Sequence, residues 1–116
     1  MKLPRRLTLT DRADFAALRK DGRSASTRFL VLSCLPKPGL KEWRYALVTS
    51  KKAGKAHERN RIRRLLRAVL IEEGAHIPPE FHLVFIARWQ AKEAGIQQLR
   101  KDVRYLLRKL KVSLPS

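Results

Sequence analysis

Residues 81–88, FHLVFIAR, are the part of the sequence that most restricts what this chain can fold into. The run is nearly continuously apolar, which is typical of a strand that is buried on both faces. Helical patterns precede and follow it, from residue 55 or 56 to 73 and from about 92 to 110, each with apolar residues at spacings of three and four. This order favours a domain in which helices pack on a sheet.

The chain before residue 23 is expected to hold a lead-in and one short helix. Residues 1–9 are basic and are expected to be loosely ordered. A helix is predicted over residues 11–20, with Thr10 or Asp11 as its N-cap and Gly22 just past its end.

Two further strands are predicted over residues 28–35 and 43–50, on either side of a turn that is rich in Pro and Gly. Residues 23–28, RSASTR, could extend the first of these strands or form a short strand of their own. The order is then helix, two or three strands, helix, strand and helix. We therefore expect a single α+β or mixed α/β domain over residues 1–116, with 112–116 as a short tail.

The net charge of the chain indicates a polyanionic partner. There are 27 Lys and Arg residues against 10 Asp and Glu, a formal net charge of +17. Repulsion of this size opposes folding unless a polyanion neutralises it, and nucleic acid is the leading candidate. The apolar runs are far shorter than the roughly 18 residues of a membrane-spanning helix. With no visible signal peptide and only one cysteine, we expect a cytoplasmic protein.

The positive charge is concentrated in residues 51–67, KKAGKAHERNRIRRLLR, which hold eight Lys or Arg and one acid, Glu58. A helix dipole disfavours cations at the amino end, yet here they crowd it, and Glu72 and Glu73 lie near the carboxyl end. A helical projection puts four polar residues together, opposite the apolar stripe: Asn60, Arg63, Arg64 and Arg67. A solvated face would usually mix charges of both signs, so this face favours binding to phosphate.

The loop before this helix strengthens that interpretation. Gly54 permits a tight turn, and Lys51, Lys52 and Lys55 flank it. The free N–H groups at the start of the helix point toward the same place. Because the P-loop pattern GxxxxGK[ST] is absent, we expect the ligand to be the backbone of a polynucleotide.

The same stretch closely resembles the RNR signature of the bacterial ribonuclease P protein subunit: a Lys-Lys pair, Gly, Lys, Arg-Asn-Arg, a basic pair and a further Arg. The resemblance covers nearly the whole chain, including the DF and closing Gly of the first helix and the strands RYALVTSKK and LVFIAR. It implies the order α-β-β-β-α-β-α and a mixed sheet with a left-handed βαβ crossover, the ribosomal protein S5 domain 2-like fold.

The resemblance also implies a function. In that family the catalyst is an RNA, and the protein assists it in cutting the 5′ leader from precursor tRNA. The implied partners are the catalytic RNA and precursor tRNA, with no obligate protein partner. The protein itself would bind no cofactor, whereas the holoenzyme would require Mg²⁺.

Two sets of residues fall on the functional positions of that family. The contacts to the catalytic RNA are implied at Lys51, Lys52, Lys55, Arg59, Asn60, Arg61, Arg63, Arg64 and Arg67. A cleft between the first helix and the sheet is implied to bind the leader, with Phe15 and Phe29 as its aromatic residues. Core packing is the alternative role for each Phe.

The sequence departs from the family at other cleft positions. Arg19 and Leu32 stand where many members carry aromatic residues. Leader binding could therefore depend more on charge, with Arg19, Arg28 or Arg44 as partners for phosphate. Glu58, next to the motif, could pair with Lys55 or another neighbouring cation.

No catalytic or metal site is predicted in the polypeptide. His57 and Glu58 are neighbours on a helix, so their side chains point about 100° apart. His76 and His82 are expected to be structural or exposed, and Cys34 to be a buried strand residue.

Three other functions are alternatives to the one that the resemblance implies. A structural RNA-binding protein, such as a ribosomal component, would share the size, charge and α+β form. A sequence-specific DNA-binding protein would need a recognition helix with a companion helix, whereas the basic helix here follows a strand. A protein of anionic membranes is disfavoured because Trp43 and Trp89 lie away from the basic helix.

Overall fold

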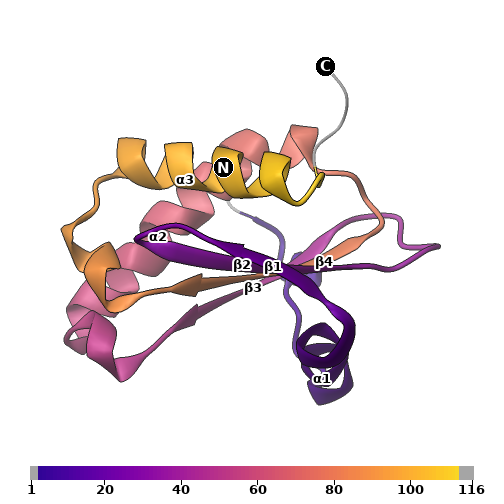
Figure 1. Cartoon of the computed structure of the whole chain (residues 1–116), viewed down its shortest axis with the longest axis horizontal. Coiled ribbons are helices and arrows are strands. Elements are labelled where there is room, and N and C mark those ends of the chain that lie inside the picture. Colours follow the sequence, from indigo (N-terminus) through magenta and orange to yellow (C-terminus); the bar gives the residue numbers. More distant parts are fainter. Residues whose placement is uncertain (1–2, 113–116) are drawn as a thin grey trace.

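The computed structural model describes residues 3–112, which form one four-stranded sheet with helices on both of its faces (Figure 1). The strands are β1 (Arg23–Ser26), β2 (Leu30–Pro36), β3 (Arg44–Thr49) and β4 (Phe81–Ala87), in the order β1-β2-β4-β3. β4 runs antiparallel to β2 and parallel to β3, so the sheet is mixed, as expected. Five of the seven residues of β4 are buried, which confirms the prediction from its apolar run.

The helices divide between the two faces of the sheet. α2 (Ala56–Glu73) and α3 (Ile96–Lys109) cover one face, and α1 (Arg12–Asp21) lies against the other (Figure 1). The main core lies under α2 and α3, and a smaller apolar cluster lies under α1. α2 connects the neighbouring parallel strands β3 and β4, so β3-α2-β4 is a βαβ unit. The left-handed sense of this crossover stays a prediction.

β1 is a separate short strand that pairs antiparallel with β2. Of the two alternatives for residues 23–28, a separate strand or an extension of the next one, the structure shows the separate strand. The hydroxyl of Thr27 accepts hydrogen bonds from the N–H groups of Phe29 (3.3 Å) and Leu30 (3.1 Å), which closes a turn between the two strands. For that reason β2 begins at Leu30 and not at Arg28.

The first helix and the basic helix lie where the sequence placed them. Asp11 is the N-cap of α1, and its carboxylate accepts a hydrogen bond from the N–H of Ala13 at 2.9 Å. The last helix begins at Ile96 and not at Lys92. Residues Trp89–Glu93 form a 3-10 helix, and Gly95 is extended, so the α-helical pattern starts only after this glycine.

The lead-in is more ordered than the sequence suggested over its described residues. Leu7 and Leu9 are buried, and the N–H of Leu9 donates to the carbonyl of Tyr45 at 2.7 Å. Thr8 forms a parallel bridge with Tyr45. An edge strand leaves backbone groups without partners, and this segment supplies some of them for β3. Of the expected tail, Val112 is buried, and 113–116 lie outside the described residues, as do 1–2.

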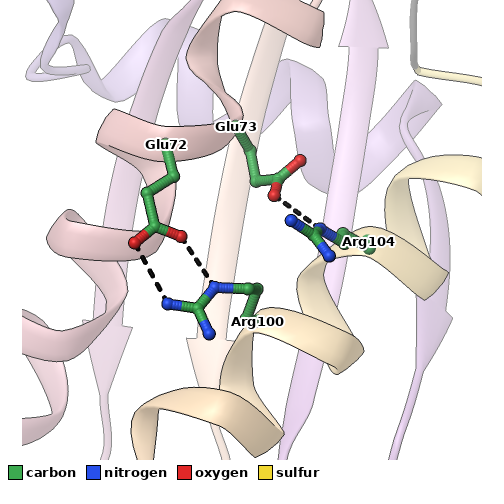
Figure 2. Close-up of polar contacts among 4 residues, drawn as sticks. All are labelled: Glu72, Glu73, Arg100 and Arg104. Carbon is green, nitrogen blue, oxygen red and sulfur yellow. Dashed lines mark hydrogen bonds and ion pairs between the residues drawn. The ribbon is translucent and has the colours of Figure 1, made fainter.

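Two ion pairs join the end of α2 to α3 (Figure 2). Arg100 forms a bidentate pair with Glu72, with N···O distances of 2.7 and 3.0 Å. Arg104 Nε lies 2.6 Å from an oxygen of Glu73, whose side chain is only 8% exposed. Carboxylates near the carboxyl end of a helix oppose its dipole, and the two arginines offset that unfavourable arrangement.

Replacing Arg104 by Met should destabilise the fold because it leaves the buried carboxylate of Glu73 without its partner. We expect the free energy of unfolding to fall by about 1–3 kcal/mol. Arg100→Met is the matched control. It should lower the free energy of unfolding by less, since Glu72 is partly exposed and can be solvated. Urea denaturation of both variants at neutral pH measures the difference, and equal losses would contradict the assignment.

Candidate nucleic-acid interface

The start of α2 is set by a glycine and an acid. Gly54 has φ +122°, and Lys55, the N-cap, is extended. The N–H of Lys55 donates to Glu58 Oε1 at 3.1 Å, and this hydrogen bond lowers the pKa of Glu58. A Cβ atom at Gly54 would lie 2.9 Å from the Glu58 carboxylate, so the glycine is needed for both its backbone conformation and its small size. Glu58 therefore caps the helix. Its hydrogen bond is to the backbone N–H of Lys55, whereas the sequence suggested a pair with the side chain of Lys55 or of another cation.

The basic face of α2 points away from the core, as the helical projection predicted. Ile62, Leu66, Val69 and Leu70 are buried on the opposite side. Three of the four projected residues are exposed and Arg63 is half-buried, with Arg63 Nη1 donating to Asn60 Oδ1 at 2.9 Å. Within residues 3–112, no described cation between 52 and 67 forms an ion pair with a carboxylate. The face is therefore a strip of unneutralised positive charge.

A cleft of about 1020 Å³ follows the edge of the sheet beside this strip. Its floor is β3 from Tyr45 to Val48, and one wall is α2, including Arg63, Arg64 and Arg67. The opposite wall is formed by the segment before α1, with Arg5, and by Phe15 of α1. We call this space the β3-edge cleft. It brings the basic motif and the first-helix aromatic residue, which the sequence treated as separate surfaces, onto one continuous concave surface.

Phe15 both packs on the core and lines the β3-edge cleft, and its contact with the leader stays a prediction. The side chain is half-buried and packs against the small cluster that includes Leu9 and Leu18. It also lines the β3-edge cleft. One face of a partly buried ring can stay accessible to a base while the other packs on the core.

Phe29 and Leu32 are not in this cleft, which corrects the expectation for both residues. Phe29 packs against the main core on the other face of the sheet, with its ring centre 5.5 Å from the guanidinium of Arg28. Leu32 is fully buried in that core. Side chains alternate along β2, and Leu30, Leu32 and Cys34 point toward α2 and α3.

The other predicted contacts are distributed around the start of α2. Lys52 and Lys55 are exposed, whereas the side chain of Lys51 lies outside what the structure describes. Arg61 Nη2 donates to the carbonyl of Ala94 at 3.4 Å, so this residue also ties α2 to the segment before α3. Arg59 is half-buried, and its Nε has no described partner. These two arginines therefore also make contacts within the fold, in addition to their predicted role in binding RNA.

The remaining candidate cations of the leader site lie outside the cleft lining. Arg19 is exposed on α1 and Arg44 is exposed on β3. Arg28 lies 4.0 Å from a carboxylate oxygen of Glu93. Sequence reasoning missed Arg5 as a member of the cleft, although the alternation in RRLTLT was a signal that this segment could lie along a strand.

Two buried titratable groups, His82 and Cys34, lie away from the cleft. His82 is buried and faces α1, with Nδ1 3.9 Å from an oxygen of Asp14, and burial lowers the pKa of this histidine. Burial likewise raises the pKa of the Cys34 thiol. In the part of the chain that the structure describes, no three His, Cys, Asp or Glu side chains gather as a metal site requires. No described helix is both long and apolar enough to span a membrane.

The family of the chain follows from comparison with known proteins. The family model described as Ribonuclease P matches residues 3–111. The chain belongs to the ribonuclease P protein family. It is therefore a protein component of ribonuclease P, whose role lies in processing the 5′ end of tRNA, and its partner is the ribonuclease P RNA. Family membership decides against the ribosomal alternative.

Individual relatives agree with this assignment. The chain is 37% identical to the ribonuclease P protein component of Shouchella clausii, over 88% of this chain and 84% of the relative. It is 36% identical to that of Bacillus pumilus, over 92% and 90%. The solved RNase P protein of Staphylococcus aureus superposes with a TM-score of 0.83 at 28% identity, covering 91% of this chain and 96% of the other.

Removing the carboxylate of Glu58 should loosen the start of α2 in a pH-dependent way. The pKa of Glu58 is lowered from its ordinary value of 4.5, so its stabilising effect is present above that value and is lost as the pH falls through the lower, folded-state pKa. Glu58→Gln should therefore be less stable than the parent at neutral pH, and the difference should close in acid. Glu58→Ala also removes the oxygen that accepts the hydrogen bond from Lys55, so it should lose more stability than Glu58→Gln.

Chemical denaturation of the three proteins at neutral and acidic pH measures this effect. A difference between the parent and Glu58→Gln that stays constant over the whole pH range would show that the charge of Glu58 has no part in capping α2.

Proposed function

We propose that the basic face of α2 binds the catalytic RNA of ribonuclease P and that the β3-edge cleft holds the 5′ leader of precursor tRNA. In this proposal the RNA carries out the cleavage, with Mg²⁺, and the polypeptide supplies no catalytic group. The observation that carries the proposal is the continuity of the cleft, which places Phe15 opposite Arg63, Arg64 and Arg67 across the floor of β3.

The chemistry of this cleft suits an unpaired strand. An aromatic ring can stack on any base, and cations along a groove can follow the phosphates without selecting a sequence. The arginines have planar guanidinium groups that bind phosphate oxygens in pairs. A leader that varies from one precursor to another needs this kind of contact, because it offers no fixed sequence to recognise.

The basic face of α2 carries positive charge that no described carboxylate neutralises. This charge supports the proposal that the exposed side of α2 binds a phosphate backbone. The carboxylates of Glu72 and Glu73, at the far end of the same helix, are bound to α3, so they do not neutralise the strip (Figure 2). Cations that replace counterions around RNA reduce the Mg²⁺ needed to fold and dock it. We therefore expect the protein to matter most when Mg²⁺ is limiting.

Arg64→Ala should weaken assembly with ribonuclease P RNA and make it less sensitive to salt. Each lost phosphate contact should reduce the log–log slope of affinity against salt concentration by roughly 0.7 to 0.9. Lys41→Ala, which removes an exposed cation from a loop outside the cleft, is the matched control. Filter binding over a salt series measures both slopes, and an unchanged slope for Arg64→Ala would remove this residue from the interface.

Phe15→Leu should weaken binding of precursor tRNA by the reconstituted holoenzyme about five-fold or more, because leucine keeps the packing but cannot stack. Affinity for mature tRNA, which has no leader, should be unchanged. Phe29→Leu is the matched control and should preserve discrimination, since Phe29 lies against the core on the other face. Cleavage and binding assays at limiting Mg²⁺ measure the effect.

Two outcomes would contradict the leader site. The first is an equal loss of affinity for precursor and mature tRNA in Phe15→Leu. The second is a larger loss of discrimination in Phe29→Leu than in Phe15→Leu. Precursor cleavage by the protein without its RNA would overturn the proposed division of labour altogether.

A further inference from the structure

A second basic surface lies on the helical layer, away from the β3-edge cleft. A hollow of about 610 Å³ is formed between the carboxyl end of α2 and α3. Its lining includes His76, Lys101, Arg104, Tyr105 and Arg108, and it shares no residue with the β3-edge cleft. We call it the α3 hollow.

The two acids in the lining of the α3 hollow are withdrawn from solvent. Glu73 is buried and bound to Arg104 (Figure 2). Asp102 is only 7% exposed, and its oxygens accept hydrogen bonds from the hydroxyl of Thr27 (2.8 Å) and the amide of Gln98 (2.9 Å). Three cations of the lining remain at the surface, and two of them, Lys101 and Arg108, form no ion pair among the described residues, whereas Arg104 is paired with Glu73.

Arg104 is held in an orientation that suits an anionic ligand. Its Nε is fixed by Glu73, and no contact among the described residues uses its two terminal nitrogens. The side chain is 56% exposed. A guanidinium that is anchored through one nitrogen loses less freedom when its other N–H groups bind phosphate.

The exposed ring of Tyr105 distinguishes this surface from an ordinary solvated helix face. It is 45% exposed, and Lys101 and Arg108 are its neighbours at spacings of four and three on α3. The helix dipole accounts for Arg108, in the last turn, but not for Lys101, about two turns from the end. An accessible aromatic ring among cations is the combination that binds unpaired nucleotides.

We propose that the α3 hollow is a second site for single-stranded RNA. The ring of Tyr105 stacks on one base, and Lys101, Arg104 and Arg108 contact the adjoining phosphates. The site lies on different elements from the β3-edge cleft, so one protein molecule can hold two RNA segments at once. This inference does not rest on the leader assignment, because the two surfaces have no residue in common.

The test follows backbone amide signals of the isotopically labelled protein by NMR during titration with a short single-stranded oligoribonucleotide. We expect saturable shifts in α3 that are separate from those in α2. Tyr105→Ala should weaken binding at α3 about five-fold or more, and Tyr105→Phe should preserve it, because only the first change removes stacking. Lys109→Ala, which removes an exposed cation of the same helix outside the hollow, is the control and should change α3 binding less than Lys101→Ala.

An oligonucleotide of the same length without bases separates stacking from charge. It should bind the α3 hollow of the parent protein more weakly than the normal strand, and this difference should vanish in Tyr105→Ala. Absence of α3 shifts when α2 is saturated would overturn the proposal. So would equal affinity for the two strands, or equal binding of a polyglutamate peptide, because each would mean that the hollow attracts anions without recognising RNA. Failure of the leader proposal would instead appear as an absence of RNA-induced shifts for the residues of α2 and β3 that line the β3-edge cleft.

Discussion

Burial of β4 on both of its faces is the constraint on which the rest of the structure depends. An apolar strand between two others needs a cover on each side, and the chain supplies two long helices for one side and the short α1 for the other. A short helix covers only part of a sheet face. Val48, on β3, is 41% exposed and lies in the part that α1 leaves open, where it forms part of the floor of the β3-edge cleft. The candidate site is thus a consequence of how unevenly the two faces are covered.

The few acids of this chain are used mainly in structural contacts. Glu58 caps α2, Glu72 and Glu73 bind α3, and Asp102 is bound to Thr27 and Gln98. Each of these carboxylates accepts hydrogen bonds from a backbone N–H group, a polar side chain or an arginine of α3. The cations along the β3-edge cleft consequently have no described acid partner, and a surface potential of one sign survives on a folded protein. Electrostatic repulsion in the free protein is the cost of keeping this surface ready for RNA.

The sequence was sufficient for the helices, the central strand and the orientation of the basic face, because those features depend on regular spacing within one element. It was insufficient where the answer depends on contacts between elements. The resemblance implied that Phe29 lies in a cleft beside the first helix, and the apolar residues on both faces of the neighbouring β2 gave no independent sign that it packs on the other face of the sheet. The order of residues 7–9 depends on pairing with a strand more than thirty residues away. The start of α3 depends on a glycine whose extended conformation only the structure reveals.

The position of β4 in the chain has a consequence for biosynthesis. β2 and β3 both pair with β4, yet they do not pair with each other, and β4 is the last strand to be translated. The sheet therefore cannot close until Ala87 has left the ribosome, by which time the whole of α2 has already emerged. Folding must then proceed through pairings that are distant in sequence, which are slow to form. During that interval the basic residues at the start of α2 are exposed in a cell rich in RNA, before the scaffold that positions them exists.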